Sequence, residues 1–168
     1  MAQPNILFIM TDQQRADAMG CSGGWVKTPN LDRIASEGVR FANTVTTSPV
    51  CIPARISLVT GRYPHNTEIW NNCKHDMPPE TPTWWQSIRD AGYRTSLFGK
   101  THLHRHEGDL RDREHLICAY GMDDIDEITG PRASVRCKTN MTERWEEKGF
   151  WQQYIDDYAD RYQNKPWV

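Results

Sequence analysis

Residues 5–10 form a continuous apolar run that is followed at once by polar residues. A run without alternation is typical of a central strand that is buried on both faces of a parallel sheet. The polar stretch 11–14 would then lie at the carboxyl end of this strand, where α/β proteins place their sites. The pattern predicts a buried strand over 5–10 with candidate site residues directly after it.

Helical segments with clear start and stop signals separate the apolar stretches. Thr28-Pro29 opens one helix, because a capping residue followed by proline fits a helix start, and Gly38 ends it. The same Thr-Pro signal recurs at residues 81–82. The predicted elements are strands over 5–10, 39–46 and 94–98, and helices over 28–38, from about 53 to 60, and over 81–92.

Strands that alternate with capped helices predict an α/β fold, a three-layer sandwich with a largely parallel central sheet. The pattern weakens beyond about residue 105. Residues 104–114 are charged and loop-like, whereas residues 145–162 have helical spacing. No closing strand follows, so we expect the sheet to be incomplete and the second half to be the start of something larger.

Length and charge restrict the class of protein. A chain of 168 residues can form one domain with a core, and its net charge of −2 argues against general attraction to nucleic acid or a membrane surface. The N-terminal apolar run is too short for a signal peptide and lacks basic residues before it. We expect a cytoplasmic location, or a periplasmic one if a signal was removed. The oligomeric state is left open.

The five cysteines are an odd number without Cys-x-x-Cys spacing, which favours one special cysteine over a disulfide framework. Cys51 precedes Pro53 and Arg55, and Pro53 predicts a helix that starts at about residue 53. Cys51 would then face the free N–H groups of a helix start, which lower the pKa of a thiol and bind anions. Arg55 adds a permanent cation one turn further on. A buried cysteine before an ordinary helix is the alternative interpretation.

Two further pairs of polar residues are candidates for a functional site. Asp12 and Gln13 offer oxygen ligands at a strand end, which suits Ca²⁺ or Mg²⁺. Lys100 and His102 follow a predicted strand with one residue between them, so both could face one side. A solvated loop lysine is the alternative for Lys100. A less favoured alternative is a zinc site in which His104 and His106 combine with Cys73 and His75.

The segment from Cys51 to Arg55, followed by Thr60-Gly61-Arg62 and then Tyr63-Pro64-His65, resembles the signature of the sulfatases. These are formylglycine-dependent hydrolases of the alkaline-phosphatase superfamily. Residues 4–13, 28–32 and 99–103 are similar to three other motifs of the family, and 120–124 is a weaker match. Ala54 replaces a common serine, and Gln13 stands where two adjacent aspartates are usual. The resemblance implies that residues 1–168 are the N-terminal part of a sulfatase catalytic domain, strongly family-like over 1–105 and weaker over 106–168.

The resemblance also implies a mechanism. Cys51 would be oxidised to formylglycine by a formylglycine-generating enzyme or an anaerobic maturase. One hydroxyl of the hydrated aldehyde would attack the sulfur of a sulfate ester, and the other would expel the sulfate. The implied catalytic residues are Cys51, Arg55, Lys100 and His102; Lys100, His102 and His65 would bind substrate. Asp12, Gln13 and Cys51 would bind the cation, with Ca²⁺ as the first choice and Mg²⁺ or Mn²⁺ as alternatives.

Three functional hypotheses therefore remain. The first is a sulfuric ester hydrolase whose remaining metal ligands, in family members, come from beyond residue 168. The second is a phosphonate monoester or phosphodiester hydrolase of the same superfamily, which Gln13 supports. The third is a non-catalytic truncated fragment that binds a partner through an exposed sheet edge. The identity of the sulfate ester is left open.

Overall fold

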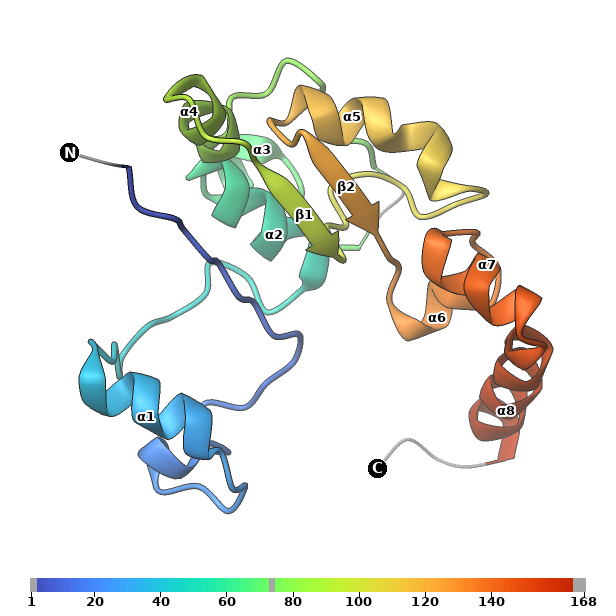
Figure 1. Cartoon of the computed structure of the whole chain (residues 1–168), viewed down its shortest axis with the longest axis horizontal. Coiled ribbons are helices and arrows are strands. Elements are labelled where there is room, and N and C mark those ends of the chain that lie inside the picture. Colours follow the sequence, from blue (N-terminus) through green and yellow to red (C-terminus); the bar gives the residue numbers. More distant parts are fainter. Residues whose placement is uncertain (1–2, 73–74, 165–168) are drawn as a thin grey trace. The chain divides into compact units, whose positions relative to one another are not determined.

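The computed structural model of the chain describes residues 3–72 and 75–164 (Figure 1). These residues divide into two compact units, an N-terminal unit that ends at Val45 and a C-terminal unit that begins at Thr46. Among the helices of the described residues, none is both long enough and apolar enough to cross a membrane.

The N-terminal unit contains a short 3₁₀ helix, η1 (Gly20–Ser22), and the helix α1 (Pro29–Glu37). The predicted helix is therefore confirmed. Its Thr28 hydroxyl does not cap the helix backbone; it donates to Asp32 Oδ1 at 2.8 Å and accepts from the Gly20 N–H at 2.9 Å. Thr28 thus ties η1 to the first turn of α1 and leaves the helix start to Pro29, which needs no N–H partner.

The strands predicted over 5–10 and 39–46 are wrong for this structure, because neither segment forms a strand. The apolar side chains of both are exposed, with Leu7 at 84% and Val45 at 87%. A strand is stabilised by hydrogen bonds and packing from neighbouring strands rather than by its own sequence. Across residues 3–72 and 75–164 the structure has one sheet, and neither segment belongs to it.

The C-terminal unit holds the sheet and most of the helices. In chain order its elements are α2 (Cys51–Thr60), α3 (Pro64–Thr67), α4 (Trp84–Asp90), β1 (Ser96–Gly99), η2 (Leu110–Arg113), α5 (Glu114–Ala119), β2 (Asp124–Glu127), α6 (Pro131–Ser134), α7 (Asn140–Glu147) and α8 (Phe150–Asn164).

The two strands β1 and β2 lie side by side and run parallel (Figure 1). Ser96 is opposite Asp124 and Gly99 is opposite Glu127, so the carboxyl ends of both strands reach the same edge of the sheet. Parallel strands need a crossover connection, which here includes η2 and α5. The predicted fold class is confirmed as α/β with a parallel sheet that is incomplete at two strands.

The core of this unit forms between α2 and the segments around the sheet. Ile52, Ile56 and Val59 project from α2 into it, each no more than 3% exposed. Tyr120 is fully buried in the same cluster, and its hydroxyl donates to the backbone carbonyl of Met77. The helix that carries the signature therefore also supplies a large part of the core.

Two predicted helices have different bounds. The helix predicted from Thr81-Pro82 begins at Trp84, because Thr83 forms a capping box with Gln86: the Thr83 hydroxyl accepts from the Gln86 N–H, and the Gln86 side chain accepts from the Thr83 N–H. The helical spacing over 145–162 is divided between α7 and α8. Gly149 separates them with a φ of 72°, which a residue inside an α-helix does not adopt.

Replacement of Ile56 by alanine should destabilise the chain by about 2–5 kcal/mol, because Ile56 is 1% exposed and its removal leaves a cavity in the core. The control is Leu58→Ala on the same helix, where the side chain is 41% exposed and the loss should be much smaller. Urea unfolding followed by circular dichroism measures both. Equal losses for the two variants would contradict this assignment of the core.

Candidate active site

Cys51 is the first residue of α2, so the helix begins about two residues earlier than predicted. Pro53 becomes its third residue, still in the first turn, where a missing N–H removes no hydrogen bond. The Ile52 N–H donates to Asn72 Oδ1 at 2.9 Å, so a side chain twenty positions away caps this helix. Cys51 is partly buried, and Lys100 Nζ donates to its Sγ at 3.8 Å. The structure therefore brings Cys51 and Lys100 together.

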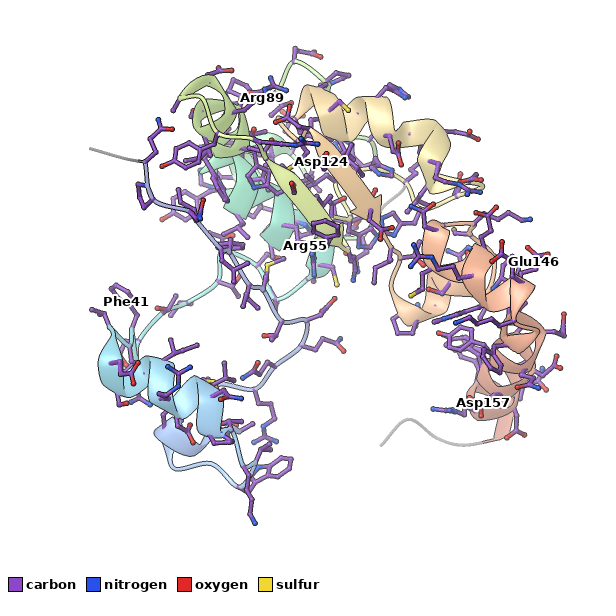
Figure 2. All side chains as sticks on the ribbon, in the orientation of Figure 1. Phe41, Arg55, Arg89, Asp124, Glu146 and Asp157 are labelled. Carbon is purple, nitrogen blue, oxygen red and sulfur yellow. The ribbon has the colours of Figure 1, made fainter. Side chains whose placement is uncertain are left out.

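Arg55 lies on the next turn of α2 and is 8% exposed (Figure 2). Its Nη1 donates to the backbone carbonyl of Lys100 at 2.5 Å. This bond links α2 to the segment that leaves β1. Arg55 thus fixes the backbone of Lys100 while it keeps a permanent positive charge in a largely buried place.

Lys100 directly follows β1, so it lies at the carboxyl edge of the sheet. Gly130 comes three residues after β2, and a Cβ at this position would lie 3.5 Å from Lys100 Nζ. The chain after each strand therefore passes the same ammonium group. This is the edge of a parallel sheet at which α/β proteins place their sites.

His102 has a backbone φ of 60°, a left-handed conformation that is uncommon for residues other than glycine. Burial, together with electrostatic interactions with His106, Lys100 and Arg55, lowers the pKa of His102 to about 4, against an opposing effect of Glu127. The imidazole is therefore neutral at physiological pH. Among the residues that the structure describes, its buried Nδ1 has no hydrogen-bond partner. A neutral imidazole beside two cations can accept a proton from a bound anion or its adduct.

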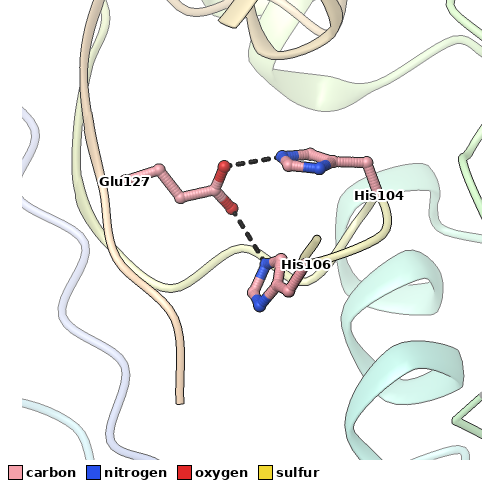
Figure 3. Close-up of side chains that lie close together, drawn as sticks. All are labelled: His104, His106 and Glu127. Atoms are coloured by element: carbon pink, nitrogen blue, oxygen red, sulfur yellow. Dashed lines mark hydrogen bonds and ion pairs between the residues drawn. The ribbon is translucent and has the colours of Figure 1, made fainter. Parts of the chain in front are cut away.

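A second group of polar side chains lies behind His102. The His106 ring stacks on the His102 ring with centroids 4.5 Å apart. Figure 3 shows His104 and His106 both directed at the carboxylate of Glu127, with His104 Nε2 2.6 Å from Oε2 and His106 Nε2 3.5 Å from Oε1. All three residues are buried, and this His/Glu group could hold a metal ion.

Glu127 is ionised although it is buried. Burial raises the pKa of its carboxyl, but contacts with His104, His106 and Thr101 outweigh this effect and lower the pKa to about 2. Glu127 is not among the site residues predicted from the sequence. The available signal was its position at the carboxyl end of β2, which is the same argument that selected Asp12 and Lys100.

The zinc alternative from the sequence used other partners. Cys73 lies outside the described residues, and His75 is not a member of the group. The third acidic or imidazole side chain beside His104 and His106 is Glu127, which comes from a separate strand. Sequence proximity did not point to Glu127, because β1 and β2 pair across more than twenty residues.

Asp12 and Gln13, the predicted ligands of a hard cation, belong to the N-terminal unit. Both residues are exposed, and Gln13 has a φ of 56°. Their role as metal ligands stays a prediction.

His65, the other predicted substrate-binding residue, is exposed on α3. Its ring stacks on Tyr63 with centroids 5.7 Å apart and planes 9° from parallel. The assigned role in substrate binding likewise stays a prediction.

Solved structures define the fold class. The chain is similar to the phosphonate monoester hydrolase of Agrobacterium radiobacter, with a TM-score of 0.67 and 25% identity. The similarity covers 90% of this chain and 30% of that one. It is also similar to a structure determined in complex with its substrate D-glucosamine-2-N,6-O-disulfate, with a TM-score of 0.56, 39% identity, and coverage of 60% of this chain and 20% of that one. The class is the alkaline-phosphatase/sulfatase-like α/β fold.

The family model for sulfatases matches residues 4–166, and the chain belongs to the sulfatase family. The uncharacterized sulfatase YidJ of Escherichia coli is 43% identical over 110 residues, which are 64% of this chain and 22% of that protein. The chain thus spans about a fifth of the length of the curated relatives that it matches.

Asp76 holds the segment that carries the two buried histidines. Its carboxylate accepts from the backbone N–H of Arg105 at 2.8 Å, from the Arg105 guanidinium at 2.8 Å and from Arg113 at 3.0 Å. Arg105 lies between His104 and His106, so these bonds fix the backbone of the group. Partial burial raises the pKa of Asp76, but the bonds from Arg105 and Arg113 outweigh it and lower the pKa far below its usual value.

A carboxyl with a lowered pKa contributes stability that is fully present above its unfolded-state pKa of about 4. This contribution declines below that value and is lost only as the pH falls through the lower folded-state pKa. We therefore expect Asp76→Asn to lower the urea midpoint at neutral pH, and we expect this deficit to be smaller, but not abolished, at about pH 3. The control is Asp17→Asn, which removes an exposed pair with Arg15 and should change little at either pH. A deficit for Asp76→Asn that is the same at both pH values would contradict the assignment.

Proposed function

We propose that the chain is the N-terminal part of a sulfuric ester hydrolase in which Cys51 is the precursor of the nucleophile. The observation that carries this proposal is the contact between Lys100 Nζ and Cys51 Sγ, 3.8 Å, at the carboxyl edge of a parallel sheet. Membership of the sulfatase family supports it. As formylglycine, formed by a dedicated maturing enzyme, position 51 would supply a hydroxyl nucleophile in place of a thiol.

The residues around position 51 have complementary roles in this proposal. Lys100 binds the oxygens of the sulfate group and stabilises the charge that develops on them. Arg55 holds Lys100 through its backbone carbonyl and adds a positive charge to the site. His102 is neutral, so it can take a proton from the nucleophilic group and return it when the product leaves. The substrate would be a sulfate ester, as in the relative solved with a sulfated glucosamine.

A divalent cation belongs to the same proposal, with Ca²⁺ as the first choice. The donor chemistry fits, because the Asp12 carboxylate and the Gln13 amide supply oxygen atoms, the ligands that Ca²⁺ and Mg²⁺ prefer. We assign Asp12, Gln13 and position 51 as the ligands that this chain contributes. The cation would polarise the sulfate oxygens and favour ionisation of the nucleophile.

Hydrolysis of phosphonate monoesters is the second candidate function. Two observations favour it: the fold similarity to the phosphonate monoester hydrolase covers 90% of this chain, and Gln13 replaces an aspartate that is usual in sulfatases. A neutral amide lowers the negative charge near the cation. Sulfate and phosphonate esters place similar charge on their oxygens, so Lys100 and Arg55 would serve either substrate.

Conversion of Cys51 should be visible by mass spectrometry. After co-expression with a maturing enzyme, the tryptic peptide with position 51 should be lighter by the difference between a thiol and an aldehyde, and it should react with a hydrazide probe. Cys118→Ser, which alters an exposed cysteine, should leave this conversion unchanged. An unmodified thiol after co-expression would count against catalysis and favour the fragment hypothesis.

Lys100→Met should lower kcat for an aryl sulfate by roughly a hundred- to a thousand-fold, because it removes a preorganised cation from the reacting group. The assay uses the complete gene product with Ca²⁺ present, and it measures an aryl phosphonate monoester in parallel. Lys138→Met is the matched control, since Lys138 pairs with Glu146 on the surface. Higher kcat/KM for the phosphonate would select the second function; no turnover of either ester would reject both.

A further inference from the structure

The His/Glu group of His104, His106 and Glu127 has the composition of a transition-metal site. Its members are 1%, 7% and 6% exposed, and their ligand atoms all lie within 4.8 Å of one another. The two histidines come from the segment after β1 and the glutamate from the end of β2 (Figure 3). A metal here would join the two connections that leave the sheet at one edge.

The outer contacts of the group orient its ligand atoms. His104 Nδ1 lies 3.1 Å from the backbone carbonyl of Arg105, which can only accept, so Nδ1 carries a proton. A histidine that donates one ring N–H to a carbonyl presents the other nitrogen to a metal, and this arrangement is usual among metal-ligating histidines. Glu127 Oε1 accepts from the hydroxyl of Thr101 and from its N–H at 3.2 Å, which fixes the carboxylate.

Hydrogen bonds among the described residues leave one ligand atom of the group, His106 Nε2, unsatisfied. This nitrogen is buried and, within the part of the chain that the structure describes, has no hydrogen-bond partner. Glu127 Oε1 is 3.5 Å away, which is too long for an N–H···O bond. A buried polar atom without a hydrogen bond destabilises the folded state. An ion pair between His104 and Glu127 explains their 2.6 Å contact but leaves His106 Nε2 without a hydrogen bond.

We propose that His104 Nε2, His106 Nε2 and Glu127 bind one Zn²⁺, with water as the fourth ligand. Two imidazoles and one carboxylate are a typical ligand set for zinc, whereas Ca²⁺ and Mg²⁺ prefer oxygen ligands alone. The ligand atoms of a tetrahedral zinc lie about 3.3–3.4 Å apart, so small side-chain rotations bring the three ligands into place. The ion fastens residues 101–106 to β2 and thereby holds Lys100 and His102 in position. Its ligands differ from those assigned to the oxygen-ligand cation of the proposed function.

Metal content tests the proposal without any assay of turnover. The full chain is stripped with a chelator, supplied with Zn²⁺, separated from free ion and measured by elemental analysis, with the expected result of one zinc per chain. X-ray absorption should show nitrogen and oxygen ligands at about 2.0–2.1 Å and no sulfur. Excess Ca²⁺ should leave the zinc bound. Substoichiometric zinc, a sulfur ligand from a cysteine, or displacement by Ca²⁺ would each overturn the site.

Variants locate the ion. Glu127→Gln keeps the size of the side chain and its bond from Thr101 but removes the charge, and His106→Ala removes a ligand; each should weaken zinc binding by more than roughly a hundred-fold. His115→Ala is the control, since this histidine is exposed on α5 and outside the group. Circular dichroism confirms that the variants fold. If Glu127→Gln and His106→Ala bind zinc as tightly as the wild type, or if His115→Ala loses zinc to the same extent as they do, the assignment is wrong. The wild-type absorption spectrum decides the question should the buried variants fail to fold.

Discussion

The buried carboxylate of Glu127 connects the two halves of the candidate site. It ends β2, yet it accepts from Thr101 and contacts His104 and His106, all of which follow β1. A buried negative charge requires such partners, because an unpaired ion is very costly away from water. The backbone between Lys100 and His106 is therefore fixed against the strand from which Glu127 comes, and His102 takes its left-handed conformation within this fixed segment.

A second link places the segment against the signature helix. Arg55 spans from α2 to the carbonyl of Lys100, and the Lys100 ammonium returns to Cys51. Ile52 and Ile56 anchor α2 in the hydrophobic core, whereas Arg55 and Cys51 on the same helix contact Lys100. The proposed zinc site and the proposed nucleophile thus share one support, the chain from β1 to His106. Failure of one proposal would not remove the other, since their tests measure different properties.

Local signals predicted the elements whose ends are fixed locally. Pro29 and Gly38 bound α1 nearly as expected, and Gly61 ends α2 with a φ of 69°. The same reasoning failed at residues 5–10, because an apolar run becomes a strand only when neighbouring strands pair with it. The structure instead leaves Leu7 exposed. Local pattern also placed the start of α4 too early, since the capping box at Thr83 competes with the Thr-Pro signal.

The sequence by itself determined the family, the parallel α/β class and the motif residues Cys51, Arg55, Lys100 and His102, because these depend on residue type and spacing along the chain. Only the tertiary structure decided which side chains meet. The Arg55–Lys100 bond and the group around Glu127 join residues that are more than twenty positions apart. Strand pairing and core packing, which act between distant segments, create these contacts, and no periodicity along the chain records them.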